Sequence, residues 1–169
     1  MIFRSVEALN RRIGQAVAWL TFLMVINTLI VLLGRDVFGF GKIWLQEITG
    51  WMHASVFLLA AAYTLQADAH VRVDVFYREF SARRKAMVNI AGTLLLLLPF
   101  CGFMIIESWG YVFGARGSWA SLEASRQAGG LPYPATPLLK TFMLLMPTLI
   151  ALQGITGLVR DMALLRKTD

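Results

Sequence analysis

Long apolar runs separated by short polar stretches set the pattern of this chain. The runs cover residues 13–33, 44–65, 86–113 and 138–159. About 20 apolar residues are enough for a helix to cross a bilayer, so each run predicts one spanning helix. We expect an all-α, polytopic membrane protein with four transmembrane helices in a single membrane domain, residues 1–169. We also expect short interfacial helices in the second and third loops, residues 67–85 and 114–137.

The composition supports a membrane protein. The chain is 57% hydrophobic and 15% charged, with a mean hydropathy of +0.63, whereas soluble domains carry about 25% charged residues. The single cysteine, Cys101, lies inside an apolar run. It excludes an intramolecular disulfide and is typical of a small buried apolar residue.

The basic residues flank the apolar runs, and their distribution predicts the orientation. With four spans, both chain ends and the loop 67–85 share one side, which holds eleven Lys and Arg residues against five on the other. The positive-inside rule places that side in the cytoplasm. The loop 114–137 then faces the periplasm, and the protein lies in the bacterial inner membrane. Contacts with anionic lipid account for the net charge of +6, and no base-reading motif points to nucleic acid.

The run 44–65 carries polar side chains on a helix of membrane length. At about 100° per residue, Gln46 and His53 fall on one stripe that also contains small residues, and Glu47 lies beside it. Placing such polar groups in lipid is energetically unfavourable unless they face protein or water. The small residues on the same stripe allow a second helix to approach closely. The candidate contacts with a partner subunit are Trp44, Gln46, Glu47, Gly50, His53 and Ala61.

Two of these residues have other interpretations. Glu47 lies in the first turn, where a carboxylate favours the helix N-terminus. His53 lies deeper and either makes a hydrogen bond between helices or ligates a cofactor. A single haem cannot join His53 to His70, because a continuous helix would separate them by about 25 Å.

No motif in the sequence indicates an enzyme. There is no nucleophile–base–orienter set, no phosphate-binding loop in a strand–helix context and no metal-ligand cluster. A complete transport path would show broken helices and several buried polar groups. The sequence therefore predicts an accessory subunit that supports a larger membrane partner.

Three short motifs follow one another in a characteristic order. They are Trp-x-x-Glu at 44–47, His-x-Arg-Val-Asp at 70–74, and a Ser-Trp…Glu-Ala-Ser…Gly-Gly-Leu-Pro stretch at 118–132. With these motifs and four spans, the chain resembles, over nearly its full length, the small membrane (DctQ-like) subunit of tripartite ATP-independent periplasmic (TRAP) transporters. The stretch 118–132 is similar to the branch associated with mannitol or chloroaromatic-type substrates.

The resemblance implies a division of labour among three proteins. A large permease subunit carries the substrate and sodium sites, and a periplasmic substrate-binding protein delivers an organic acid. The small subunit is a fixed scaffold beside the large one and part of the docking surface. The resemblance implies no ATP hydrolysis, catalytic residue, metal, cofactor or substrate contact in this chain. The ligands that it leaves for this chain are bound phospholipid and surrounding membrane lipid.

The resemblance also assigns roles to single residues. Trp44 and Glu47 match the motif at the start of the second helix, and His70, Arg72 and Asp74 match the cytoplasmic motif. These positions are expected to fix helix ends and subunit contacts. Many family members have two acidic residues where this chain has Gln46 before Glu47, so a role that needs paired carboxylates is in question.

External basic residues are candidates for docking the binding protein. They are Arg35, Lys42, Arg116 and Arg126. They either meet an acidic surface of that protein or reach towards lipid headgroups. Two other functions stay open: a membrane anchor of a redox complex that holds haem or quinone at His53, and a small exporter that works as a homodimer.

Overall fold

The computed structural model describes residues 2–69, 77 and 79–167. Its helices are α1 (Ile2–Asp36), α2 (Ile43–Gln66), α4 (Ala82–Gly92), the π-helical η1 (Thr93–Leu97), α5 (Leu98–Phe113) and α6 (Ala135–Lys167). The described residues contain no strand, and α4, η1 and α5 join into one helix. Four helices are therefore long and apolar enough to cross a membrane, which confirms the all-α, four-span prediction.

The helices extend beyond the apolar runs that predicted them. The first begins at Ile2 and the last continues to Lys167, so both carry polar turns past the hydrocarbon core. Asn10 shows why the first extension is ordered: it is 1% exposed and donates a hydrogen bond of 2.8 Å to Gln153 on α6. The polar start of α1 is thus tied to the middle of α6.

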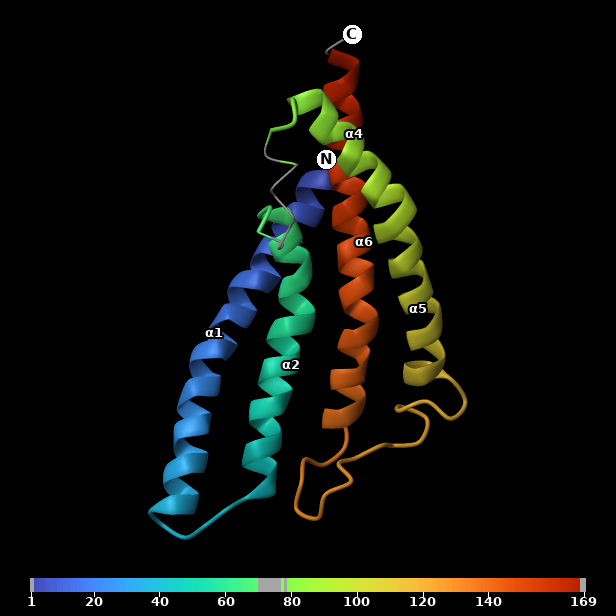
Figure 1. Ribbon diagram of the computed structural model, residues 1–169. Helices are drawn as coiled ribbons and strands as arrows, with labels where there is room; N and C mark the ends of the chain where they lie inside the picture. Colours follow the sequence, from blue (N-terminus) through green and yellow to red (C-terminus); the bar gives the residue numbers. More distant parts are fainter. Residues whose placement is uncertain (1, 70–76, 78, 168–169) are drawn as a thin grey trace.

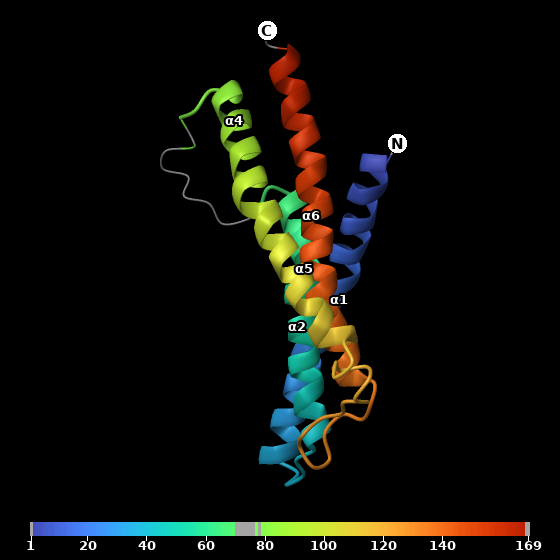
Figure 2. The ribbon, with the colours of Figure 1, turned by 90° about the vertical axis from the view of Figure 1, so that its right-hand side faces the viewer.

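The four spans lie side by side in the order α1, α2, α6 and α5 (Figure 1). α2 packs between α1 and α6, and α6 also packs against α4 and α5. Figure 2 shows that α1, α4 and α6 diverge at the end that carries both termini. This arrangement leaves long helix faces uncovered.

The buried core of this layer is small. Its buried apolar residues in the described part of the chain are Val17, Ala62, Ala86, Cys101, Val112 and Leu149. By contrast, Leu95 and Trp19 are 74% and 71% exposed. Apolar surface on this scale must be covered by lipid or by another protein.

A wide turn accommodates Pro99 in the third span. Proline has no N–H, and its ring collides with the carbonyl four residues earlier, here that of Leu95. The π-helical turn η1, Thr93–Leu97, lies at this position and joins α4 to α5. The third span therefore stays continuous through the proline.

The interfacial helix expected in the third loop is absent. Residues 114–134 form a series of turns, and Leu122 and Gly129 both have positive φ angles, +49° and +78°. The helical spacing around Trp119 is overridden because the Glu123 N–H donates to the Ser118 carbonyl and closes a turn. The expected second-loop helix falls largely on residues 70–76 and 78, outside the described residues.

Candidate functional site

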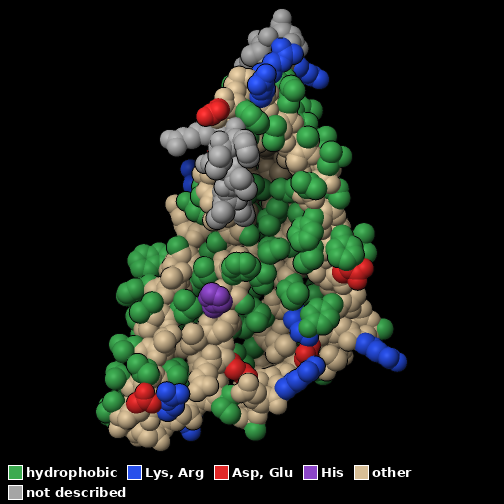
Figure 3. Space-filling model, in the orientation of Figure 1, with side chains coloured by type: hydrophobic (Ala, Val, Ile, Leu, Met, Phe, Trp, Pro, Cys, Tyr) green, Lys and Arg blue, Asp and Glu red, His purple; other side chains and the backbone are tan. Residues whose placement is uncertain are grey.

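The predicted polar stripe of α2 lies on the outside of the helical layer. Gln46, Gly50 and His53 are exposed, Phe57 is 71% exposed, and Trp44 is 42% exposed. A histidine side chain is visible on the surface in Figure 3. Among the described residues, none forms a hydrogen bond with the side chain of Gln46 or His53.

The opposite face of α2 is packed within the chain. Ser55 and Ala62 are each 1% exposed, and the indole N–H of Trp51 donates to the carbonyl of Ala135 at 3.1 Å. Asn27 of α1 donates to the Leu45 carbonyl and to the Thr49 hydroxyl, both at 2.8 Å. The two faces of α2 thus differ: only the inner one has its polar groups paired. Ala61 lies between them and is partly buried.

Glu47 has a role that its position in the sequence did not reveal. Its carboxylate accepts a hydrogen bond of 2.6 Å from the Leu131 backbone N–H and another from the Ser125 hydroxyl. Gly130 makes this possible, since an added Cβ would lie 2.7 Å from the carboxylate oxygens. The side chain therefore fastens the loop 114–134 to the start of α2.

A second anchor holds the same loop to α6. Lys140 contacts Glu123 at 2.5 Å, and the Ser118 hydroxyl donates to that carboxylate at 2.7 Å. The hydrogen bond from Lys140, followed by that from Ser118, holds the pKa of Glu123 below its ordinary value. Lys140 also lies 4.0 Å from the centre of the Tyr111 ring, a cation–π contact.

A tryptophan forms the third anchor of this loop. The indole N–H of Trp119 donates to the Thr141 hydroxyl on α6 at 3.0 Å, and its ring meets Tyr133 edge to face. The sequence predicted only an interfacial position for this part of the chain. The loop is instead fixed to α2 and α6 by side chains that lie far apart in the sequence.

The four candidate docking residues lie at the loop end of the layer and are all exposed. They are Arg35, Lys42, Arg116 and Arg126. Blue side chains mark this end in Figure 3. Arg35 donates to the neighbouring Asp36 at 2.8 Å, and Arg126 directly follows the anchoring Ser125. The cytoplasmic motif residues His70, Arg72 and Asp74 lie outside the described residues.

The described residues contain no group of three or more His, Cys, Asp or Glu side chains arranged to hold a metal ion. What the geometry offers is an uncovered helix face and a loop fixed in one conformation.

A family comparison agrees with this geometry. Residues 23–164 match the model of the family "Tripartite ATP-independent periplasmic transporters, DctQ component". No curated protein and no solved structure matches the chain. The family is one of transporter components, and the match covers most of the chain: the second and third spans completely, nearly all of the fourth, and the second part of the first. The chain therefore belongs to the DctQ family, as the multi-pass small permease component of a bacterial TRAP transporter.

Proposed function

We propose that this chain is the stationary scaffold on which the large permease subunit of its TRAP transporter is mounted. The exposed stripe of α2 is the central contact, formed by Gln46, Gly50, His53 and Phe57, and Trp44 adds a contact at the start of the helix. The complex lies in the inner membrane with both termini of this chain in the cytoplasm. It uses an ion gradient, most simply that of sodium, to take up an organic acid that the binding protein delivers. The substrate belongs to the mannitol or chloroaromatic-type branch.

The observation that carries this proposal is the unpaired polar stripe on an otherwise apolar surface. The imidazole of His53, which lies deeper in the span than Gln46, loses hydrogen bonds to water, and lipid chains cannot replace them. A facing helix can supply these bonds, and Gly50 lets that helix approach closely. The inner face of α2 is already filled by α1 and α6, so the partner must come from outside the chain.

The loop 114–134 supports a role in docking the binding protein. Its anchors on Glu47, Lys140 and Thr141 hold it in one conformation, so little conformational entropy is lost when a partner binds. Arg116 and Arg126 are exposed on this loop. Their positive charges can steer an acidic protein surface towards the membrane complex.

Substitution at Gly50 tests the scaffold role. An added Cβ at Gly50 meets nothing within 4 Å, so Gly50→Trp leaves the packing of this chain intact and places a bulky ring on the proposed contact. We expect co-purification of the large subunit to fall strongly, together with uptake. Gly102→Trp on α5 is the matched control, since its added Cβ also meets open space. Undiminished co-purification of the Gly50→Trp variant would contradict the proposed interface.

A further inference from the structure

The third span is weakest where α4 meets α5. The π-helical turn η1, Thr93–Leu97, interrupts the regular hydrogen-bond ladder there, and Pro99 donates no backbone hydrogen bond across it. Gly92 directly precedes the turn, and a Cβ added to it meets nothing within 4 Å. Helices bend at prolines and at π-helical turns, because part of the ladder that keeps a helix straight is missing there. The turn η1 can therefore serve as a hinge between α4 and α5.

A close contact with α6 holds this turn in place. Leu97, the last residue of η1, packs directly on Gly154, where an added Cβ would lie 2.7 Å from the Leu97 Cδ2 atom. Thr93, the first residue of η1, lies 3.6 Å from the same point. Beyond the turn, α5 packs along α6. The contact is thus a pivot: α4 can rotate about it while α5 keeps its position.

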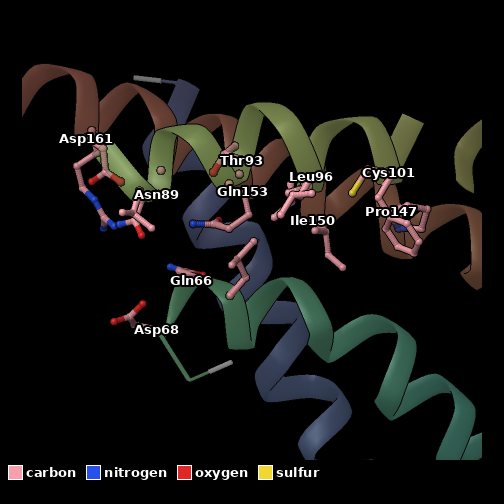
Figure 4. A pocket seen from close by; sticks show the side chains of 18 of the residues that line it. Gln66, Asp68, Asn89, Thr93, Leu96, Cys101, Pro147, Ile150, Gln153 and Asp161 are labelled. Atoms are coloured by element: carbon pink, nitrogen blue, oxygen red, sulfur yellow. The ribbon is translucent and has the colours of Figure 1, made fainter. Parts of the chain in front are cut away.

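The space for such a rotation is a cavity of about 770 Å³ between α4 and the end of α2. Val88 and Asn89 line it on α4, Leu65 and Gln66 line it on α2, and residues of η1, α5 and α6 complete the lining. In Figure 4, Asn89 extends from one side of the cavity and Gln66 from the other. Figure 2 shows that α4 and α6 also diverge towards the end that carries both termini. α4 therefore has room to approach α2.

The two sides of the cavity carry hydrogen-bond groups that lack partners. The side-chain oxygen of Gln66 is buried and accepts no hydrogen bond from the described residues. The oxygen of Asn89 accepts from the Tyr77 hydroxyl at 3.0 Å, which leaves the NH₂ group of Asn89 available as a donor. A buried acceptor without a donor is unfavourable. Movement of α4 towards α2 would bring the donor to the acceptor.

We propose that α4, Ala82–Gly92, is a hinged arm that pivots at η1 and closes on the end of α2. In the closed state the NH₂ group of Asn89 donates to the side-chain oxygen of Gln66. Val88, which is 47% exposed in the open state, becomes buried against α2. α1, α2, α5 and α6 keep their positions, so the scaffold has one moving part. The arm goes beyond the scaffold role, because mounting the large subunit requires no second conformation of this chain.

Distances between spin labels test the arm. Met87 on α4 and Ala67 at the end of α2 are both exposed, and a nitroxide on each reports the separation of arm and scaffold. Leu23 on α1 and Phe103 on α5 are also exposed and form the matched pair within the scaffold. The native Cys101 is replaced by Ala, and the chain is purified with its large subunit. Double electron–electron resonance should give two distances for the first pair and one narrow distance for the second. A single narrow distance for the first pair, or two distances for both pairs, would overturn the proposal.

Replacing the proline tests the hinge itself. Pro99→Ala restores a backbone N–H, so a regular helix can run through η1 and the two distances of the labelled arm should merge into one. Pro132→Ala, in the loop 114–134, is the control and should leave both distances in place. Co-purification with the large subunit verifies that each variant is folded. Two distances that persist in Pro99→Ala would show that η1 is not the pivot.

Removing the acceptor tests the closed state. The oxygen of Gln66 is unpaired in the open state and paired in the closed one, so Gln66→Leu should lower the population at the shorter distance by about threefold or more. Gln15→Leu is the control, since Gln15 is exposed on α1 and does not line the cavity. An unchanged population in Gln66→Leu would refute the contact between Asn89 and Gln66.

Discussion

Glu47 and His53 lie on the same helix, less than two turns apart, and their surroundings differ completely. The carboxylate of Glu47 accepts hydrogen bonds from Ser125 and from the Leu131 backbone, both in the loop 114–134. His53 is exposed on the outer surface of the layer and receives no such bond from the described residues. The first residue is satisfied within the chain, and for the second we propose a partner outside it.

This difference shows what a polar residue in a membrane helix does and does not indicate. Its presence alone says that a partner exists, because an unpaired polar group is unfavourable in lipid. Whether the partner is a loop of the same chain or another subunit depends on the tertiary structure. For α2, the start of the helix has an internal role, and we propose an external one for the middle of its outer face.

The largest effect is expected from removing the internal anchor. Glu47→Ala leaves the Leu131 N–H and the Ser125 hydroxyl without their acceptor, so the loop 114–134 should open more often. Trypsin should then cleave after Arg126 about tenfold faster in the purified chain. Gln46→Ala is the control, because Gln46 is exposed and binds nothing in the loop. An unchanged cleavage rate in Glu47→Ala would show that the carboxylate does not hold the loop.

A smaller effect is expected when acid protonates Glu123, which forms the second anchor of the loop. The pKa of Glu123 is lowered by hydrogen bonds from Lys140 and Ser118, so its contribution to loop stability is present at neutral pH. It is lost only as the pH falls below the ordinary value of 4.5 and passes through the lowered pKa. Hydrogen exchange of residues 118–126, corrected for intrinsic rates, should accelerate in that acidic range. In Glu123→Gln the acid-dependent acceleration should be smaller and not absent, because the Glu47 carboxylate also holds this loop. An unchanged acceleration would assign it to another group.

The smallest effect is expected from the exposed charges of the loop. Reversing Arg116 and Arg126 to Glu should slow docking of an acidic binding protein without loosening the loop anchors. Uptake at limiting binding protein should fall about twofold to threefold, and recover when the binding protein is in excess. The matched reversal of Arg83 and Arg84, on the predicted cytoplasmic side, should have no effect on this step. Unchanged uptake in the Arg116 and Arg126 variant would remove these residues from the docking surface.

The sequence predicted the helices well because the membrane imposes a simple rule. A run of about 20 apolar residues must form a helix that satisfies its own backbone, and four such runs gave four spans. Helical periodicity also placed Gln46, Gly50 and His53 on one face. No pattern in the sequence indicated which face would be left uncovered, because that depends on how α1 and α6 pack.

The contacts that hold the loop 114–134 could not be predicted from sequence patterns, for a physical reason. The acceptor Glu47 and the donor Leu131 are 84 positions apart, and the donor is a backbone N–H that every non-proline residue carries. Lys140 is one of the five basic residues on the predicted external side, and its partner Glu123 is 17 positions away. The expected helix around Trp119 is absent because the Glu123 N–H closes a turn on the Ser118 carbonyl.

The central claim is that the outer face of α2 binds the large permease subunit, and photo-crosslinking from His53 tests it most directly. A benzophenone side chain in place of His53 is irradiated in native membranes, with the unirradiated sample as the baseline. We predict a covalent adduct between this chain and the many-helix permease subunit. Adducts with lipid alone, or with a second copy of this chain, would contradict the account.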